Sequence, residues 1–281
     1  MTSSAAQRQT GCPRILSHNR AGARTWNAGG EAYDHISRQI AAAIEHTVDR
    51  LDPRPGESVL DVATGTGWAA RSIAERGARV TGIDFSESVV ATARELSRGG
   101  EMTFEVADAE RLPYPDGHFD AVLSTFGVMF CARPERAASE LARVCKPAAR
   151  LALATWSPRG SVRELFELIN SYKPVAPSAA GSRPASPFDW GHTGRLIELL
   201  GEDFDLGFEE GTTYYRARDG AAAFDAFASG FGPIVSLLDE LDEEAAESFR
   251  REFELYHERH RTGVGVLVPR EYLVTVGRRY V

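Results

Sequence analysis

Residues 59–70, VLDVATGTGWAA, decide the fold that we expect for this chain. An apolar start suits a buried strand, Gly65 and Gly67 follow it, and residues 68–75 favour a helix. Glycine permits positive φ and a close backbone approach, so the pattern predicts a strand, a tight turn and a helix start. Free N–H groups at a helix start favour a polar or anionic ligand group.

Two classes of cofactor use such a turn. Gly65, Gly67 and Ala70 fit the dinucleotide pattern G-x-G-x-x-G/A. Asp61 favours the second class, because an ionised carboxylate suits an ammonium group and repels a pyrophosphate. The longer pattern D-x-A-x-G-x-G, with Ala63 at a position that is often glycine, resembles motif I of class I S-adenosylmethionine (SAM)-dependent methyltransferases. A glycine turn without a ligand is the remaining alternative.

A second carboxylate follows the next expected strand, residues 79–83. Asp84 stands at the end of that strand, where it can accept hydrogen bonds from both hydroxyls of a ribose. NAD enzymes and SAM-dependent methyltransferases share this feature, so it predicts a ribose without choosing the cofactor. Phe85 is placed to pack on an adenine face.

Asp108 and Ala109 follow the third expected strand, residues 102–106. This region resembles the surroundings of motifs II and III of the methyltransferases. The resemblance, which spans residues 32–156, implies that Asp108 accepts from the adenine amino group and that the N–H of Ala109 reaches a ring nitrogen. The alternative for Asp108 is a carboxylate that caps a turn.

The fourth expected strand, residues 119–126, brings Ser124 and Phe126 to the same edge of the sheet, near the methyl donor by analogy with the family. The motif [DN]-P-P-[YF] of methyltransferases that act on amino groups of DNA bases does not occur here, which counts against such a substrate. Ala148 and Ala149 replace a glycine pair that the family usually has before the fifth strand. Positive φ at these alanines would be strained.

The resemblance implies an α/β fold with a Rossmann-like, seven-stranded, mostly parallel sheet and helices on both faces. It further implies an antiparallel edge hairpin and an inserted helical lid over the substrate. We expect three parts: residues 1–31 as a mobile N-terminal arm, 32–156 as the SAM-binding core, and 157–281 as the lid insertion with the last two strands. Apolar residues at helical spacing predict one helix over residues 32–51.

Candidate acceptor-binding residues are aromatic. Trp26 and Tyr33 flank the start of the first helix, and Trp190 ends a proline-rich stretch, so all three could border the ligand or simply pack in the core. The catalytic residue stays unknown from sequence. Weak candidates are His18, His35 and His192. We expect no metal site, since no H-E-x-x-H or zinc-type cysteine spacing occurs.

Composition limits the class of partner. The net charge of −8 lacks the basic footprint of a nucleic-acid-binding protein. Three cysteines without a C-x-x-C pair indicate free thiols in a reducing compartment, and hence a cytoplasmic location. No apolar run reaches transmembrane length, so we expect no membrane association. We expect a monomer or a small homo-oligomer.

The sequence therefore predicts a SAM-dependent methyltransferase that forms S-adenosylhomocysteine and methylates carbon, nitrogen or oxygen of a small molecule, such as a secondary metabolite. One alternative is an NAD(P)-dependent oxidoreductase, which leaves Asp61 and Asp108 unexplained. Another is a SAM-binding regulatory protein without catalysis.

Overall fold

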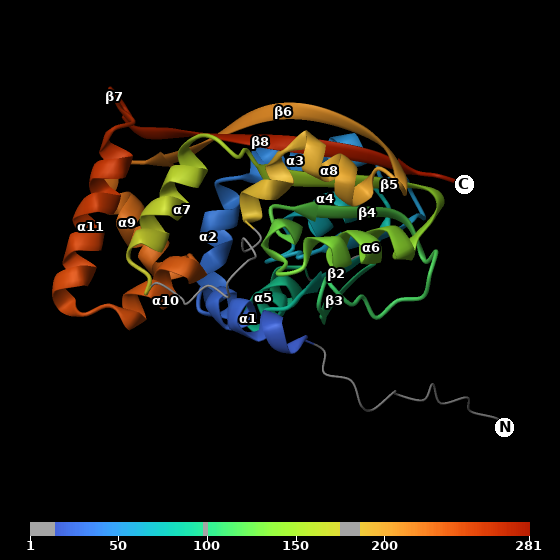
Figure 1. Cartoon of the computed structure of the whole chain (residues 1–281), viewed down its shortest axis with the longest axis horizontal. Coiled ribbons are helices and arrows are strands. Elements are labelled where there is room, and N and C mark those ends of the chain that lie inside the picture. The colour runs from blue at the N-terminus through green and yellow to red at the C-terminus, as the bar shows by residue number, and fades with distance from the viewer. Residues whose placement is uncertain (1–14, 98–100, 175–185) are drawn as a thin grey trace.

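The computed structural model describes residues 15–97, 101–174 and 186–281. This part of the chain contains one sheet with the strand order β3-β2-β1-β4-β5-β8-β6, to which the two-residue strand β7 is added by pairing with β8 (Figure 1). Strands β1 to β5 run parallel, whereas β8 is antiparallel to both β5 and β6. The expected Rossmann-like sheet with an antiparallel edge is confirmed. The strands are β1 (Ser58–Val62), β2 (Arg79–Asp84), β3 (Met102–Val106), β4 (Phe119–Thr125), β5 (Cys145–Trp156), β6 (Phe204–Ala217), β7 (Arg261–Thr262) and β8 (Gly265–Arg279).

The strand order reverses at β1, which has β2 on one side and β4 on the other. The carboxyl ends of these parallel strands meet at one edge, and ligands of open α/β sheets bind beside such a reversal. The register pairs Asp61 with Gly82 and with Leu123, so β1, β2 and β4 end at nearly the same level. Asp61, Asp84 and Thr125 are thereby brought toward one end of the sheet.

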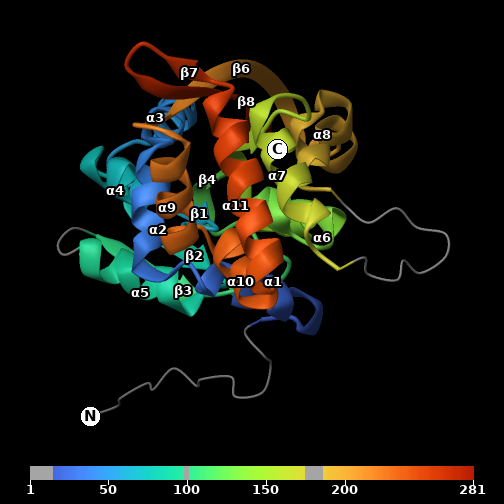
Figure 2. The same cartoon turned by 90° about the vertical axis from the view of Figure 1, so that its left-hand side faces the viewer.

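Helices cover both faces of the sheet, as expected. Figure 2 shows α3, α4 and α5 on one side of the strands and α6 and α8 on the other. Each of these helices turns apolar side chains inward, so the first apolar core lies between helices and sheet. The helices are α3 (Ala41–Leu51), α4 (Trp68–Glu75), α5 (Glu87–Leu96), α6 (Pro134–Val144) and α8 (Thr193–Leu200).

The N-terminal region, where we expected a mobile arm up to residue 31, contains helices. Its described part forms η1 (Ser17–Asn19), α1 (Arg20–Asn27) and η2 (Gly30–Ala32). The reason is tertiary packing: the ring of Trp26 lies edge-on to the rings of Tyr33 and Phe231, at centroid distances of 5.6 Å each. Such contacts stabilise a helix that the local sequence alone does not favour. Residues 1–14 lie outside the described residues.

The single helix expected over residues 32–51 is two helices. α2 (Tyr33–Arg38) ends before Gln39 and Ile40, and α3 begins at Ala41. The apolar spacing nevertheless identified the buried face, because all five of the residues on which that prediction rested are buried, namely Ile36, Ile40, Ile44, Val48 and Leu51.

A second apolar core lies in helices beyond the fifth strand. α9 (Gly220–Gly230), α10 (Gly232–Glu240) and α11 (Glu243–Glu258) are inserted between β6 and β8, as predicted, and gather with α7 (Ser161–Ser171) at one end of the molecule (Figure 1). We call α7, α9, α10 and α11 the lid helices. Their core contains side chains of α2, so the N-terminal helices and the lid helices pack together. The proline-rich cover predicted before η4 (Pro187–Gly191) falls largely on residues 175–185, outside the described residues.

Among the described helices, none alone has the length and apolar composition of a membrane span. α9 and α10 meet those criteria only as a pair, and they meet at an angle of 88°.

The turn before the parallel part of β5 contains the predicted strain. Ala148 has φ = +61°, the left-handed region, whereas buried Ala149 has no positive φ. An L-residue costs about 1–2 kcal/mol in this region.

We predict that Ala148→Gly raises the free energy of unfolding by about 0.5–1 kcal/mol, because relief of the left-handed strain exceeds the extra chain entropy of glycine in the unfolded state. Denaturant titration measures this difference. Ala149→Gly is the matched control and should lower stability. A loss of stability in both variants would contradict the strain at Ala148.

Candidate functional site

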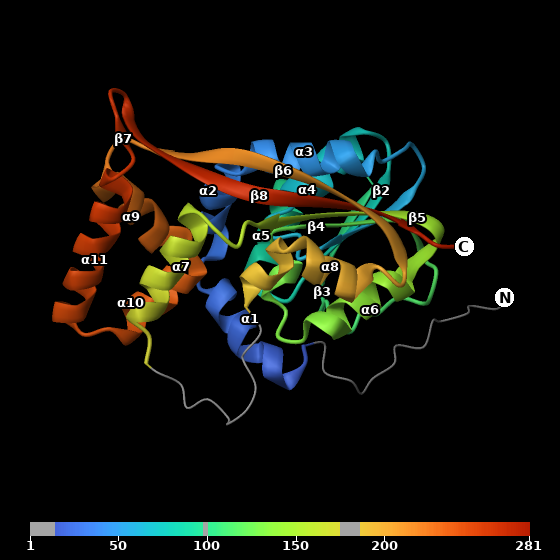
Figure 3. The ribbon, with the colours of Figure 1, turned by 45° about the horizontal axis from the view of Figure 1, so that its top comes forward.

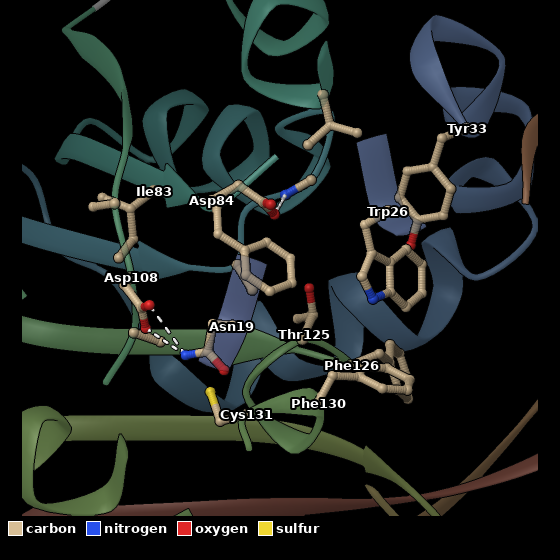
Figure 4. A pocket seen from close by; sticks show the side chains of 17 residues that line it. Asn19, Trp26, Tyr33, Ile83, Asp84, Asp108, Thr125, Phe126, Phe130 and Cys131 are labelled. Atoms are coloured by element: carbon tan, nitrogen blue, oxygen red, sulfur yellow. Dashed lines mark hydrogen bonds between the residues drawn. The ribbon is translucent and has the colours of Figure 1, made fainter. Parts of the chain in front are cut away.

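A cavity opens at the carboxyl ends of β1, β2 and β4, beneath α1 and α2 (Figure 4). It encloses about 680 Å³ of space between protein atoms, part of it open to solvent. The residues that line it are Asn19, Trp26, Tyr33, Ala63, Gly65, Ile83, Asp84, Phe85, Val89, Ala107, Asp108, Ala109, Thr125, Phe126, Gly127, Phe130 and Cys131.

The glycine turn forms one wall of this cavity. Ala63 and Gly65 both have φ = +56°, and both line the cavity. Gly67 has φ = +83° and caps the start of α4, so it shapes the turn without reaching the cavity wall. A Cβ atom at Gly127 would lie 2.2 Å from the Cβ of Ala63, so the close approach of these two segments requires glycine at position 127.

Asp61 lies behind the glycine turn. Its side chain is fully buried and does not line the cavity, so its contact with a ligand stays a prediction. Oδ2 accepts a hydrogen bond of 2.6 Å from Thr64 Oγ1, and Oδ1 has no partner among the described residues. Burial raises the pKa of Asp61 to about 7. The carboxyl group thus holds the turn and leaves one buried acceptor oxygen unpaired, which costs free energy until a donor reaches it.

Asp84 lies on the cavity wall and can accept further hydrogen bonds. Its Oδ1 accepts from Ser86 N at 2.9 Å and its Oδ2 accepts from Gly65 N at 3.1 Å. Each carboxylate oxygen has two acceptor positions, so both oxygens retain one. Burial raises the pKa of Asp84 to about 6, although the backbone N–H groups of Ser86, Gly65 and Phe85 favour the ionised form. Phe85 follows it on the same wall, as expected.

Asp108 has no free acceptor position, because donors from the N-terminal segment already bind its carboxylate (Figure 4). Nδ2 of Asn19 lies 3.0 Å from both carboxylate oxygens. Leu16 N donates to Oδ2 and Glu110 N donates to Oδ1, each at 2.9 Å. Four contacts fill the four acceptor positions of a carboxylate. An adenine amino group could therefore bind Asp108 only by displacing one of these donors, two of which come from the N-terminal segment.

The opposite end of the cavity is aromatic. Trp26, Tyr33, Phe126 and Phe130 line it (Figure 4). Phe126 has φ = +57°, and its ring stacks on Trp156 at a centroid distance of 3.8 Å. Burial raises the pKa of Tyr33 to about 12, so its hydroxyl stays protonated near neutral pH.

The same four aromatic residues also line a second cavity, which reaches into the lid helices. We call it the lid cavity. Its remaining walls are Ile36, Ile40, Trp156, Val162, Leu165, Phe166, Phe227, Phe231 and Arg270.

Helix α2 is tied to the glycine turn by one carboxylate. Asp34 Oδ1 accepts from Thr66 Oγ1 and from Trp68 Nε1, both at 2.8 Å. This link holds Tyr33 over the turn, where its ring would lie 3.5 Å from a Cβ atom at Gly65. Tyr33 was expected either to border the ligand or to pack in the core, and the structure places it on the cavity wall beside this turn.

Two further predicted site residues lie elsewhere. Ser124 Oγ donates to Val62 O at 2.7 Å and accepts from Val128 N at 3.1 Å, so it joins β1 to the turn after β4 and does not line the cavity. Trp190 is fully buried in the sheet core, where its carbonyl accepts from Thr155 Oγ1. Neither residue lines the cavity, so the prediction that they contact a ligand gains no support from the geometry.

None of the three candidate histidines lines either cavity. His18 Nε2 lies 2.6 Å from Oε2 of buried Glu110, His35 is exposed, and His192 borders a separate polar groove. A catalytic role for these side chains therefore has no support from the geometry.

Several wall residues were not predicted. Asn19 and Leu16, of which only Asn19 lines the cavity, carry no local signal, because their importance depends on contacts with Asp108, about 90 positions away in the sequence. Cys131 was noted only as a free thiol, and burial raises its pKa. The position of Thr125, next to Phe126 at the end of β4, was the one available hint. The other unpredicted wall residues are Ile83, Val89, Ala107, Gly127 and Phe130.

Comparisons with known proteins agree with this geometry. A family model described as a methyltransferase domain matches residues 60–153. An uncharacterized protein of Mycobacterium tuberculosis is 38% identical over 177 residues, 62% of this chain and 60% of that protein. A second one from the same organism is 31% identical over 195 residues, 68% of this chain and 70% of that protein. This chain belongs to the class I SAM-dependent methyltransferase family.

A further relative of this methyltransferase is the demethylmenaquinone methyltransferase of Beutenbergia cavernae. It is 41% identical over 111 residues, which are 40% of this chain and 45% of that protein. The chain thus spans 60% of the length of the first Mycobacterium tuberculosis relative and 45% of the length of this one.

Solved structures show the same fold. The YcgJ protein of Bacillus subtilis has 17% identity and a TM-score of 0.57, over 85% of this chain and 99% of that one. A phosphoethanolamine N-methyltransferase of Haemonchus contortus, solved with S-adenosylhomocysteine, has 16% identity and a TM-score of 0.53, over 85% of this chain and 53% of that one. These likenesses concern the fold alone.

The occupied carboxylate of Asp108 leads to a prediction for the N-terminal segment. Asn19→Ala should tighten the binding of adenosine several-fold, because removal of one amide donor frees an acceptor position on Asp108. Isothermal titration calorimetry measures the affinity. Asn27→Ala is the matched control, since Asn27 joins the same segment to Ser88 and does not touch Asp108. Weaker adenosine binding in Asn19→Ala, or equal gains in both variants, would contradict competition at Asp108.

The raised pKa of Asp84 leads to a pH prediction. We expect affinity for S-adenosylhomocysteine to fall as the pH drops below about 6, because protonation removes the charge and an acceptor position of Asp84. In Asp84→Asn the affinity for S-adenosylhomocysteine should be lower at every pH, and it should no longer decrease when the pH drops below about 6.

Unfolding does not explain such a loss. The folded pKa values of Asp61 and Asp84 lie above the ordinary value, so protonation of these groups stabilises the folded state as the pH falls toward about 4, and this stabilisation is lost as the pH rises through about 6 to 7. A thermal unfolding scan at each pH provides the control. An affinity that stays constant from about pH 5 to 8 in the unmodified protein would contradict the assignment.

Proposed function

We propose that this protein transfers a methyl group from SAM to a small-molecule acceptor. The observation that supports it most is the position of Asp84, which faces a cavity at the strand-order reversal and keeps two free acceptor positions beside the glycine turn. The two vicinal hydroxyls of a ribose match these positions. The proposal also draws on membership of the methyltransferase family.

The residues present fit a SAM molecule. Asp84 would hold the ribose hydroxyls, Phe85 would lie against the adenine, and Gly65 would let the backbone approach the methionine part. The unpaired Oδ1 of Asp61 gives the region behind the turn an acceptor that suits an ammonium group. Asp108 and the N–H of Ala109 would bind the adenine edge once Asn19 and Leu16 have withdrawn from the carboxylate.

When bound, SAM supplies a sulfonium methyl group that an acceptor nucleophile displaces. This chain supplies binding, orientation and exclusion of water. The aromatic end of the cavity, formed by Trp26, Tyr33, Phe126 and Phe130, would exclude water and meets the lid cavity. The titratable groups at this end are unsuited to act as a general base at neutral pH, since Tyr33 and nearby Cys131 both have raised pKa values. We infer that the acceptor nucleophile needs little help in losing a proton.

The lid cavity supports a small acceptor, such as a secondary metabolite, over a macromolecule. Its described walls come from the segment after β4, from β5 and β8, and from the lid helices and the N-terminal helices, so an acceptor would be enclosed on several sides. Apolar and aromatic side chains form these walls, except for Arg270. Such a lining suits an apolar ligand.

Calorimetric titration with SAM, S-adenosylhomocysteine, NAD and NADP, each alone, tests the proposal. We expect the two sulfur nucleosides to bind and the two dinucleotides to give no heat of binding. Transfer of a labelled methyl group to a panel of small apolar acceptors is the second measurement. Binding of NAD or NADP alone would favour an oxidoreductase, and binding of SAM without transfer to any acceptor would favour a regulatory protein.

A further inference from the structure

Arg270 occupies an unusual place on β8. Alternate residues of this strand face the lid core, and Val266, Val268, Arg270 and Tyr272 are all buried. A strand that faces an apolar core usually carries apolar residues at each of these positions. Figure 3 shows β8 running from the sheet to the lid helices, so this row crosses from one core to the other. Arg270 interrupts it with a cation.

The guanidinium of Arg270 has no anionic partner among the described residues. The residue is only 6% exposed, and no hydrogen bond or ion pair involves its side chain in the described part of the chain. Its Cζ lies over two rings, 4.6 Å from the centroid of Tyr215 and 5.5 Å from that of Phe227. Ring faces attract a cation but leave the N–H groups at its edge unpaired.

The titratable groups around Arg270 do not neutralise it. They are Tyr215, Tyr256 and His257. Burial raises the pKa of Tyr215 to about 12, and burial lowers the pKa of His257 to about 4, so both are neutral near pH 7. The hydroxyl of Tyr256 donates to Ser161 O and is also protonated. Arginine keeps its charge even when buried, and buried charges in proteins are normally paired.

Arg270 lines the lid cavity, whose other walls are apolar or aromatic. That cavity shares Trp26, Phe126 and Phe130 with the cavity that faces Asp84. The unpaired cation therefore stands in an enclosed apolar space that borders the proposed site of the methyl donor.

We propose that the methyl acceptor is an apolar, ring-containing molecule with an anionic group, and that Arg270 binds this group. That this molecule accepts a methyl group rests on the proposed function, because the lid cavity borders the proposed site of the methyl donor. The anionic group supplies the charge that the cavity lacks, and the aromatic walls suit a flat ring. A guanidinium presents paired N–H groups that match a carboxylate or a phosphate.

Isothermal titration calorimetry with three matched probes, 2-naphthoate, 2-naphthyl phosphate and the neutral 2-naphthamide, tests the proposal. In the unmodified protein at least one anion should bind about tenfold more tightly than the amide, since a hydrogen bond to a charged group contributes roughly 1.5–3 kcal/mol. Comparison of the two anions tells whether the group is a carboxylate or a phosphate.

Variants of Arg270 assign the preference to this side chain. Arg270→Met should weaken anion binding at least about tenfold and leave amide binding unchanged, and Arg270→Lys should retain part of the preference. Arg163→Met is the control, because Arg163 is an exposed arginine on α7 and does not line the lid cavity. Arg270→Met should unfold at the same or a higher temperature, because it removes an unpaired buried charge.

The proposal fails if no probe binds, if anions and amide bind equally, or if Arg270→Met keeps the preference. Titration of the same preparations with S-adenosylhomocysteine separates this failure from that of the proposed function. Anion preference without binding of S-adenosylhomocysteine would overturn the methyltransferase proposal and leave an anion site, whereas the reverse would overturn only the role of Arg270.

Discussion

The pair of hydrogen bonds from Gly65 N and Ser86 N to Asp84 is the interaction on which the site depends. It joins the glycine turn after β1 to the end of β2, and so holds the two walls of the cavity at a fixed separation. The same bonds keep a buried carboxylate oriented with an acceptor position free on each oxygen. Since β1 and β2 are paired in register, the sheet itself sets where this carboxylate stands.

Two elements added to the sheet complete the enclosure. Asp34 ties α2 to the glycine turn, while η1, directly before α1, places Asn19 on Asp108. The lid helices pack on α2 and on β8, so the N-terminal helices and β8 both join the cofactor half to the lid.

The parts that sequence predicted are those set by local patterns. Alternating strands and helices predict an α/β sheet, and the residues that directly follow the expected strands include Asp84, Phe85 and Asp108, all of which line the cavity. Strain at Ala148 was predicted because alanines replace the family's usual glycine pair there, and the φ of Ala148 is positive. The resemblance also implied the helices between the last two strands, although their role as a lid over substrate stays a prediction.

The parts that sequence missed depend on contacts between distant segments. Asn19 reaches Asp108 only because Trp26 packs its helix against the lid core, and nothing near Asn19 in the chain indicates this. Arg270 lies in a strand whose sequence does not mark it as unusual. Its position becomes notable only when the side chains around it are known. Trp190 was expected at the ligand, but the fold buries it in the core.

The most direct measurement of the central claim is a crystal structure of the complex with S-adenosylhomocysteine. The account predicts that both ribose hydroxyls lie within hydrogen-bonding distance of Asp84, with the bonds from Gly65 N and Ser86 N retained. It also predicts that the adenine amino group replaces Asn19 or Leu16 on Asp108. A nucleoside bound elsewhere, or one that leaves both free positions of Asp84 unused, would contradict it.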